Sequence, residues 1–225
     1  MRKTFYTRFR LATRGKAIFW IPLIFLLAVI FSYFVFLTPD EGGIATFMSM
    51  AIIALVGYYY GPVPGFITSI LFGAAMFFLH SQMPTEDVIA RFVFTLFGGQ
   101  SYWGEVADYV IGYGLMGITG FFAFDKDLKA KRKGLMMNKN FIIGFGIAAL
   151  LRFIEGIWNC YYFYDLKKGS VWANLGYSTW YSFWYIGIEV ILSLIIILLP
   201  PVSSAIRYIG ECATDREYRS NTNYL

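Results

Sequence analysis

Long apolar stretches, separated by short polar segments, run through the whole chain. Six of them are long enough, or nearly so, to cross a bilayer as a helix, which takes about 20 residues. The expected membrane spans are residues 17–37, 44–60, 66–80, 106–124, 141–164 and 173–199. The pattern therefore predicts an all-α membrane protein in which residues 1–225 form a single domain of six transmembrane helices.

The polar segments between the spans differ in charge. Residues 1–16 are basic and contain no acid, residues 125–140 form a basic loop, and residues 202–225 form a polar tail. If both termini are cytoplasmic, 15 lysines and arginines lie inside and 3 lie outside, as the positive-inside rule requires. We therefore expect cytoplasmic N- and C-termini. Residues 81–105, whose apolar run is too short to span, are expected outside the cell as a loop or a re-entrant segment.

Composition supports this class and excludes others. The chain is 58% hydrophobic and 15% charged, whereas soluble domains are about 45–50% apolar and about 25% charged. The formal charge of +5 comes mainly from the cytoplasmic segments, so we expect no nucleic-acid partner. His80 is the only histidine and no cysteine has metal-site spacing, so we expect no metal and no cofactor. No nucleophile–base arrangement is evident, and we expect no catalytic residue and no enzyme activity.

A match to the GxGxxG pattern at residues 112–117 lies inside a span, with no strand before it. We expect its glycines to let helices pack closely instead, and the same holds for Gly57, Gly61 and Gly65. Ala28 and Ser32 in the first span form a small-residue pair at four-residue spacing. Such a pair serves either docking of another membrane subunit or packing within the bundle.

The fifth span carries a polar stretch at residues 150–165. On a helix, Arg152, Glu155 and Asn159 share one face. Ionisable groups cost about 2.5–3.5 kcal/mol each to insert into a membrane, and they usually face a protein interior or a cavity. Trp158 flanks this face, and a carboxylate beside aromatic rings can bind a cation. The alternative is an Arg152–Glu155 pair that only neutralises itself, among ordinary interfacial aromatics.

Other acids and rings are expected at a similar depth. Glu155 lies 14 residues after Phe141, which places it about 21 Å from the cytoplasmic edge, in the outer third of the membrane. Asp108 lies near the outer end of the fourth span. The sixth span adds three rings, Trp180, Tyr181 and Trp184. Together these residues predict an outward-facing binding pocket. Glu189, about 20 Å below the outer end of the sixth span, would close its floor, act in a proton relay, or simply be held protonated.

Four groups of residues occur in a characteristic order. They are ALVGYYYG at 54–61 with GFITSILFG at 65–73; Gly98-Gly99 with Asp108-Tyr109 and the glycines of 112–120; Arg152-Phe153; and Tyr181-Ser182-x-x-Tyr185-x-Gly187 with Pro200-Pro201. In order and spacing they resemble helices two to six of the substrate-binding S components of energy-coupling factor (ECF) transporters, most closely the thiamine-specific family.

This resemblance implies a high-affinity vitamin-binding subunit in the bacterial cell membrane. It would capture thiamine or a related cationic or heteroaromatic compound from outside, for ATP-driven import by a transmembrane coupling subunit and two ATPase subunits. Ala28 and Ser32 would dock the coupling subunit. Motif position makes Asp108, where the family has Glu, and Tyr181 the ligand contacts. The full expected ligand-binding set is Asp108, Tyr109, Glu155, Trp158, Asn159, Trp180, Tyr181, Trp184 and Glu189.

The chain departs from the family pattern at two ligand positions. Ile186 stands where the family has Asn, and Gly156 stands where it has His. We expect Glu155 and Glu189 to replace the missing polar contacts. A lost hydrogen bond to a polar ligand can change specificity by orders of magnitude. Thiamine is therefore the leading ligand, with another cationic or heteroaromatic compound as the alternative.

Two other functions stay open at this point. One is a self-sufficient ion-coupled carrier or intramembrane enzyme in which Asp108, Glu155 and Glu189 form a proton path. The other is a non-transporting accessory subunit whose aromatic face binds another helix.

Overall fold

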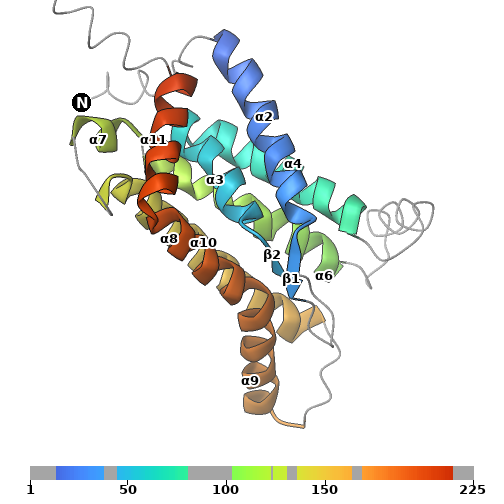
Figure 1. The fold of residues 1–225 in the computed structure, drawn as a ribbon. Helices are drawn as coiled ribbons and strands as arrows, with labels where there is room; N and C mark the ends of the chain where they lie inside the picture. The colour runs from blue at the N-terminus through green and yellow to red at the C-terminus, as the bar shows by residue number, and fades with distance from the viewer. Residues whose placement is uncertain are drawn as a thin grey trace, which may run out of the picture.

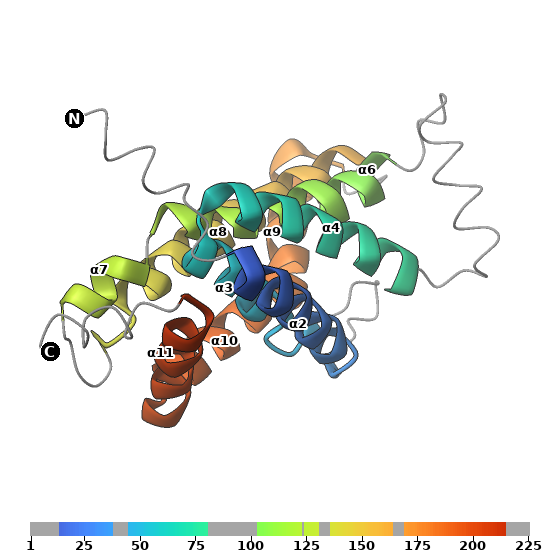
Figure 2. The same cartoon turned by 90° about the horizontal axis from the view of Figure 1, so that it is seen from above.

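Helices make up almost all of the computed structural model, which describes residues 14–37, 45–80, 103–122, 124–130, 136–163 and 169–214 (Figure 1). Five long helices of the described residues are α-helical throughout: α2 (Arg14–Ser32), α3 (Ser49–Tyr60), α4 (Pro62–His80), α8 (Lys139–Phe163) and α11 (Pro200–Thr214). Residues 103–121 and 171–198 form further helices, each built from several segments. Figure 2 shows α3 near the centre, with α4 and α8 on one side and α2 and α11 on the other.

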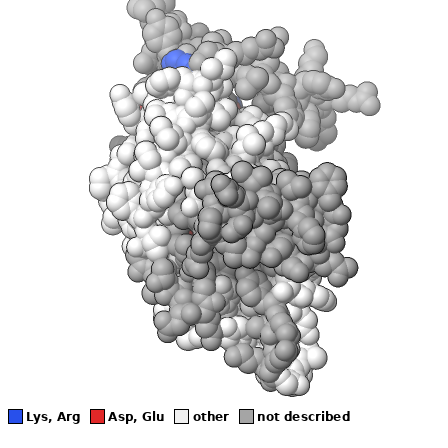
Figure 3. Space-filling view, turned by 90° about the vertical axis from the view of Figure 1, so that its right-hand side faces the viewer, with Lys and Arg blue, Asp and Glu red and all other residues white. Residues whose placement is uncertain are grey.

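The described residues include four helices that are long and apolar enough to cross a membrane. They are Pro62–Leu79, Ala107–Lys129, Lys139–Phe163 and Val171–Leu198, and two shorter apolar helices, Lys16–Ser32 and Ser49–Tyr60, accompany them. The face drawn in Figure 3 is almost wholly uncharged where the structure describes it, as a surface in contact with lipid must be. The chain is therefore an all-α, multi-pass membrane protein. Six spans and cytoplasmic termini stay predictions.

The first two predicted spans are shorter than expected. Helix α2 ends at Ser32, and strand β1 (Val35–Leu37) pairs antiparallel with β2 (Ala45–Thr46) before α3 begins at Ser49. The expected boundaries at 37 and 44 are therefore wrong, because aromatic and β-branched residues favour an extended hairpin there. The third span starts earlier than predicted, at Pro62, since proline suits the first position of a helix. Only Gly61, with φ of 97°, separates α3 from α4.

The helix at residues 103–121 is irregular. It consists of α6 (Trp103–Val106), the π-helical segment η2 (Ala107–Gly112) and the 3₁₀ segment η3 (Leu115–Phe121). Segment η3 packs against α3, α4 and α8. A Cβ atom on Gly117 would lie 2.5 Å from the Phe66 nitrogen, and one on Gly57 would lie 2.5 Å from Thr119 Oγ1. The close-packing role predicted for these glycines is confirmed, whereas Gly61 serves a turn.

The tail after the last span is helical as far as Thr214, which the prediction of a polar tail missed. Leu199 is extended, and Pro200 then starts the new helix α11 (Figure 1). Ile206 of α11 is buried, and its carbonyl accepts a 2.6 Å hydrogen bond from the Tyr59 hydroxyl. Lys16 Nζ donates to the Cys212 carbonyl at 3.2 Å. The start of α2 and the end of α11 therefore share one end of the bundle.

Ala28 and Ser32 are both completely buried within the chain. Ala28 belongs to the central apolar core, and the Ser32 hydroxyl donates to the Val29 carbonyl at 2.7 Å. Of the two predicted roles, packing within the bundle is observed, and docking of another subunit through this pair stays a prediction. The exposed surface of α2 is formed by larger side chains, Ile18, Phe19, Leu23, Leu26, Leu27 and Ile30.

Candidate functional site

Arg152 is the centre of a buried charged cluster. It lies on α8 with only 2% of its surface exposed. Its Nη1 atom donates to Asp108 Oδ1 at 2.6 Å and also to Glu155 Oε2. Sequence spacing predicted the Arg152–Glu155 pair, and the fold adds Asp108 from the neighbouring helix. One guanidinium therefore serves two carboxylates, and the three groups carry a formal charge of −1.

Two π-helical segments meet at this cluster. Asp108 lies in η2, and Tyr185 lies in η5 (Phe183–Gly187), a π-helical segment between α9 (Val171–Ser182) and α10 (Ile188–Leu198). The Tyr185 hydroxyl donates to Asp108 Oδ1 at 3.2 Å. Single π turns inside helices are rare and occur often at functional sites. Here they let side chains from two helices converge on one carboxylate.

The Arg152 guanidinium packs directly against the backbone of Gly112, where no side chain stands in its way. A Cβ atom on Gly112 would lie 2.1 Å from Arg152 Nη1, so no larger residue fits without displacing the guanidinium. The rings of Tyr113 and Tyr185 lie 5.3 Å and 6.0 Å from Arg152 Cζ. At such distances the ring faces attract a cation. The guanidinium is therefore held by two acids and two rings.

Asn159 extends the cluster along α8. It is buried, and its Nδ2 atom donates to the Gly104 carbonyl at 2.7 Å and to Glu155 Oε1 at 3.4 Å. Gly104 belongs to α6, so Asn159 ties the two helices together. This contact also places Glu155 between Arg152 and Asn159, on the helix face that the sequence predicted.

Several polar atoms around the cluster have no hydrogen-bond partner within the described part of the chain. They are Arg152 Nε, Asn159 Oδ1 and Ser182 Oγ, all of them buried. Buried polar groups in native proteins are nearly always paired, so unpaired ones indicate a missing water or ligand. The Asp108 and Glu155 side chains keep 21% and 11% of their surface exposed. The two acids are therefore accessible while their basic partner is not.

The predicted aromatic residues divide into two groups. Tyr181 is buried, and its ring lies 5.0 Å from that of Tyr185. Tyr109 also lies in η2, where its ring stacks on that of Tyr113 at 6.2 Å. These rings adjoin the charged cluster, as predicted.

The three tryptophans behave differently. Trp158 is 48% exposed and packs on Tyr162 and Phe163, and Trp180 is 60% exposed. Trp184 packs edge-on against Trp180, with ring centroids 5.4 Å apart. No contact recorded among the described residues joins these rings to Arg152 or its acids. Depth was therefore a poor guide to them, because neighbouring residues of a helix point in directions about 100° apart.

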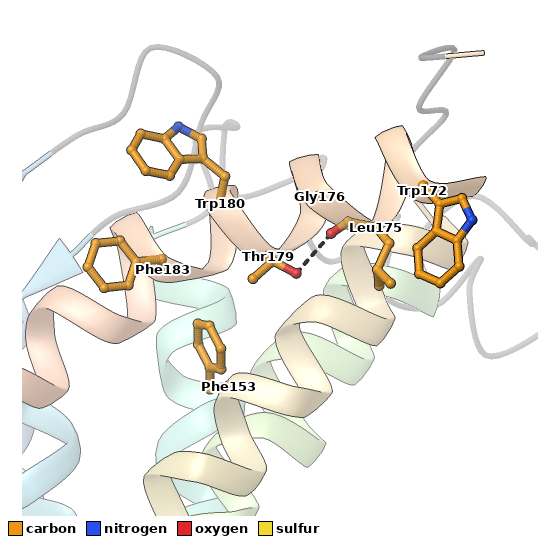
Figure 4. Close-up of a pocket in the computed structure, with 7 residues that line it drawn as sticks. All are labelled: Phe153, Trp172, Leu175, Gly176, Thr179, Trp180 and Phe183. Carbon is orange, nitrogen blue, oxygen red and sulfur yellow. Dashed lines mark hydrogen bonds between the residues drawn. The ribbon is translucent and has the colours of Figure 1, made fainter. Parts of the chain in front are cut away.

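Trp180 lines a separate apolar groove of about 590 Å³ between α8 and α9 (Figure 4). Its lining residues are Phe153, Trp172, Leu175, Gly176, Thr179, Trp180 and Phe183. The Thr179 hydroxyl donates to the Leu175 carbonyl at 2.8 Å, so it offers little to a polar ligand. The groove therefore has the chemistry of a lipid-facing surface rather than of a vitamin site.

Glu189 is buried one turn beyond Tyr185, and its carboxylate faces the start of α3. It accepts hydrogen bonds from Thr46, Ser49 and Met50. None of its recorded hydrogen bonds goes to Asp108 or Glu155. The three acids therefore do not form a continuous hydrogen-bonded chain within the described residues.

Tyr185, Tyr113, Gly112 and Ser182 were not among the predicted site residues. Tyr185 could have been found, since it lies four residues after Tyr181 and shares its helix face. Tyr113 and Gly112 could not, because their role depends on how residues 103–121 cross α8. Most of residues 81–105, the expected outer loop or re-entrant segment, lie outside the described residues.

Within the described residues, no group of three His, Cys, Asp or Glu side chains could hold a metal ion. Comparisons with protein-family models, with curated proteins and with solved structures give no match.

Proposed function

We propose that the chain is the substrate-binding subunit of an uptake transporter of the S-component kind, with thiamine or a related cationic, heteroaromatic compound as its ligand. In this proposal six spans cross the cell membrane with both termini in the cytoplasm, and the Arg152 cluster opens outward. A transmembrane coupling subunit and two ATPase subunits supply the energy. The chain itself catalyses no reaction.

The observation that carries the proposal is the unbalanced charge of the cluster. Arg152 has one guanidinium for the carboxylates of Asp108 and Glu155, and these carboxylates are more accessible than the guanidinium. The second carboxylate has no positive partner of its own among the described residues, and a compensating positive charge would stabilise it in the membrane. A ligand with a single positive charge would supply it, and thiamine carries one on its thiazolium ring.

The surrounding rings suit such a ligand. Tyr181 and Tyr185 lie beside the acids on one helix. A cation over an aromatic face gains about 0.5–2 kcal/mol, and more where water is excluded. The unpaired Asn159 Oδ1 atom would accept a hydrogen bond from a heteroaromatic ligand, and the unpaired Ser182 hydroxyl would accept or donate one.

The two departures from the S-component pattern face each other. A Cβ atom on Gly156 would lie 2.6 Å from Ile186 Cδ1 and 2.9 Å from the Tyr185 hydroxyl. Because Ile186 occupies this space, a histidine at position 156 would collide with it. Gly156 and Ile186 together offer no polar group to a ligand. The polar contacts with the ligand would therefore come from the acids and the tyrosines. This supports a ligand class shared with the thiamine family, with altered preference among its members.

Isothermal titration calorimetry of the purified chain with thiamine tests the proposal. We expect saturable binding at one site. Glu155→Gln removes the spare negative charge and should weaken binding roughly 10-fold or more, since charged hydrogen bonds contribute about 1.5–3 kcal/mol. Glu211→Gln is the control, because Glu211 pairs with Arg207 on α11, outside the cluster. Wild-type protein that binds neither thiamine nor its ring precursors would exclude this ligand class.

The same preparation decides between transport modes. Co-purification with an ATPase module supports the proposed subunit role. Flux through the isolated chain in liposomes, driven by a pH gradient, would instead favour an ion-coupled carrier.

A further inference from the structure

Glu189 completes the first turn of a helix far from it in sequence. Its Oε1 atom accepts hydrogen bonds from Ser49 Oγ at 3.1 Å and from the Met50 nitrogen at 3.2 Å. Its Oε2 atom accepts from Thr46 Oγ1 at 2.8 Å and from the Thr46 nitrogen at 3.3 Å. The first backbone N–H groups of any helix lack partners inside that helix. A carboxylate is their best acceptor, because it also suits the helix dipole.

The start of α3 needs this external cap. Met48 stands at the capping position, where it makes no side-chain hydrogen bond to the helix. Its φ of 59° lies in the left-handed region, which is unfavourable for residues other than glycine. Glu189 binds the backbone on both sides of Met48, at Thr46 and at Met50. The carboxylate thereby holds this strained turn in place and fixes α10 against α3.

Tyr185 lies four residues before Glu189 on the same continuous helix. It belongs to the π-helical segment η5, which contains an extra residue in its turn. If these residues relaxed to an ordinary α-helix, Tyr185 would rotate by about 100° relative to α10. Its 3.2 Å hydrogen bond to Asp108 would then be lost. The orientation of Tyr185 therefore depends on the contacts that hold the first turn of α10, which follows it directly in the helix.

We infer that Glu189 is a positioning residue, which holds the Tyr185 hydroxyl on Asp108 by anchoring α10 to the start of α3. Its hydrogen bonds among the described residues go to Thr46, Ser49 and Met50 and not to the charged cluster. This inference rests on the proposed function for its consequence in ligand binding, but the positioning itself is a property of the chain alone.

Fluorine NMR of protein labelled with 3-fluorotyrosine tests the positioning without a ligand. The Tyr185 resonance is identified as the one that disappears in Tyr185→Phe. Glu189→Gln should shift it by more than its linewidth, because an amide cannot accept at all four donors. The double variant Thr46→Val, Ser49→Ala removes donors instead of the acceptor and should shift the same resonance. The other tyrosine resonances report whether each variant is folded.

Ser193→Ala is the matched control. Ser193 lies one turn further along α10 and is buried, with no hydrogen-bond partner for its Oγ atom in the described part of the chain. Its replacement should leave the Tyr185 resonance in place. An unchanged Tyr185 resonance in folded Glu189→Gln protein would overturn the inference, and so would an equal shift in Ser193→Ala.

Thiamine titration then gives the functional readout. Glu189→Gln should weaken binding roughly 3- to 10-fold, the effect of one lost hydrogen bond. In a Tyr185→Phe background it should cause no further loss, since both changes remove the same contact. Independent, additive losses would show that Glu189 does not act through Tyr185. If wild-type protein fails to bind thiamine, the proposed function fails, while the NMR result still decides the positioning.

Discussion

Glu189 and the Arg152 cluster are two acidic sites along the helix of residues 171–198, which carries Glu189 and also Tyr185, the partner of Asp108. The two sites differ in how fully their polar atoms are hydrogen-bonded. Glu189 accepts four hydrogen bonds, from side-chain and backbone donors of Thr46, Ser49 and Met50. Around Arg152, two acids share one nitrogen atom, and other buried polar atoms lack partners within the described residues. The hydrogen bonds of Glu189 join two parts of the fold, whereas the unpaired atoms beside Asp108 and Glu155 leave room for a water or for the proposed ligand.

The comparison also separates acids that the sequence had grouped. Glu155 and Glu189 are both acids in predicted spans, and each stood as a replacement for a missing polar contact. Glu155 lies beside unpaired atoms of Arg152 and Asn159 and keeps 11% of its side-chain surface exposed, whereas both carboxylate oxygens of Glu189 are buried and hydrogen-bonded. The number of donors around a carboxylate thus distinguishes its role better than its depth in the membrane does.

The largest expected effect comes from removing the shared base. Arg152→Met leaves the largely buried Asp108 and Glu155 without their positive partner, which should cost about 3–5 kcal/mol of unfolding free energy. Chemical denaturation in mixed micelles measures it. Arg207→Met, which breaks a more exposed pair with Glu211, should cost at most about 1 kcal/mol. A triple variant that also carries Asp108→Asn and Glu155→Gln should recover part of the loss. Equal costs for both arginines would refute the difference between the pairs.

A medium effect is expected from filling the space beside Arg152. Gly112→Ala puts a methyl group where the guanidinium lies and should destabilise the protein by about 1–3 kcal/mol, as overpacking does. It should also weaken thiamine binding in calorimetry, because the displaced guanidinium no longer holds Asp108 and Glu155 in place. Gly146→Ala on α8 has no atom within 4 Å of the added methyl and should stabilise by about 0.5–1 kcal/mol, because alanine favours a helix. The same denaturation curves would contradict the packing argument if both variants behaved alike.

The smallest effect compares one serine from each site. Ser49→Ala removes a donor from Glu189 and should cost about 0.5–1.5 kcal/mol. Ser182→Ala removes a buried hydroxyl that has no described partner, so stability should stay the same or rise. Ser182→Ala should instead weaken thiamine binding in calorimetry. A stability loss at Ser182 as large as that at Ser49 would mean that the hydroxyl is already paired.

Helical spacing was sufficient to predict the polar face of α8. Arg152, Glu155 and Asn159 lie together because a regular helix brings residues three and four apart onto one face. The partner Asp108 was expected only at a similar depth, and the fold brings it within 2.6 Å of Arg152. Helix rotation was not accessible from sequence, which is why Trp158 and Trp180 were expected in the site but lie outside it.

The other missed features depend on long-range contacts. The β-hairpin between α2 and α3 lies in an apolar run whose pattern is equally compatible with the end of a helix. The buried positions of α11 are mostly three or four residues apart, as on one face of a helix. The polar residues between them led instead to the prediction of a polar tail. The cap on α3 comes from Glu189, more than a hundred residues later, so no local signal for it exists.

Helix α3 has a consequence for biosynthesis. Glu189 caps its first turn across 139–143 residues of sequence, and Ile206 and Ala213 bind the hydroxyls of Tyr59 and Tyr60 across 147 and 153 residues. Chains emerge from the ribosome with the N-terminal part first. Both ends of the central helix therefore wait for partners that are translated last. A chain stalled before residue 189 would hold α3 in the membrane with its end groups unpaired, and the insertion machinery or a quality-control protease could recognise it as unfinished.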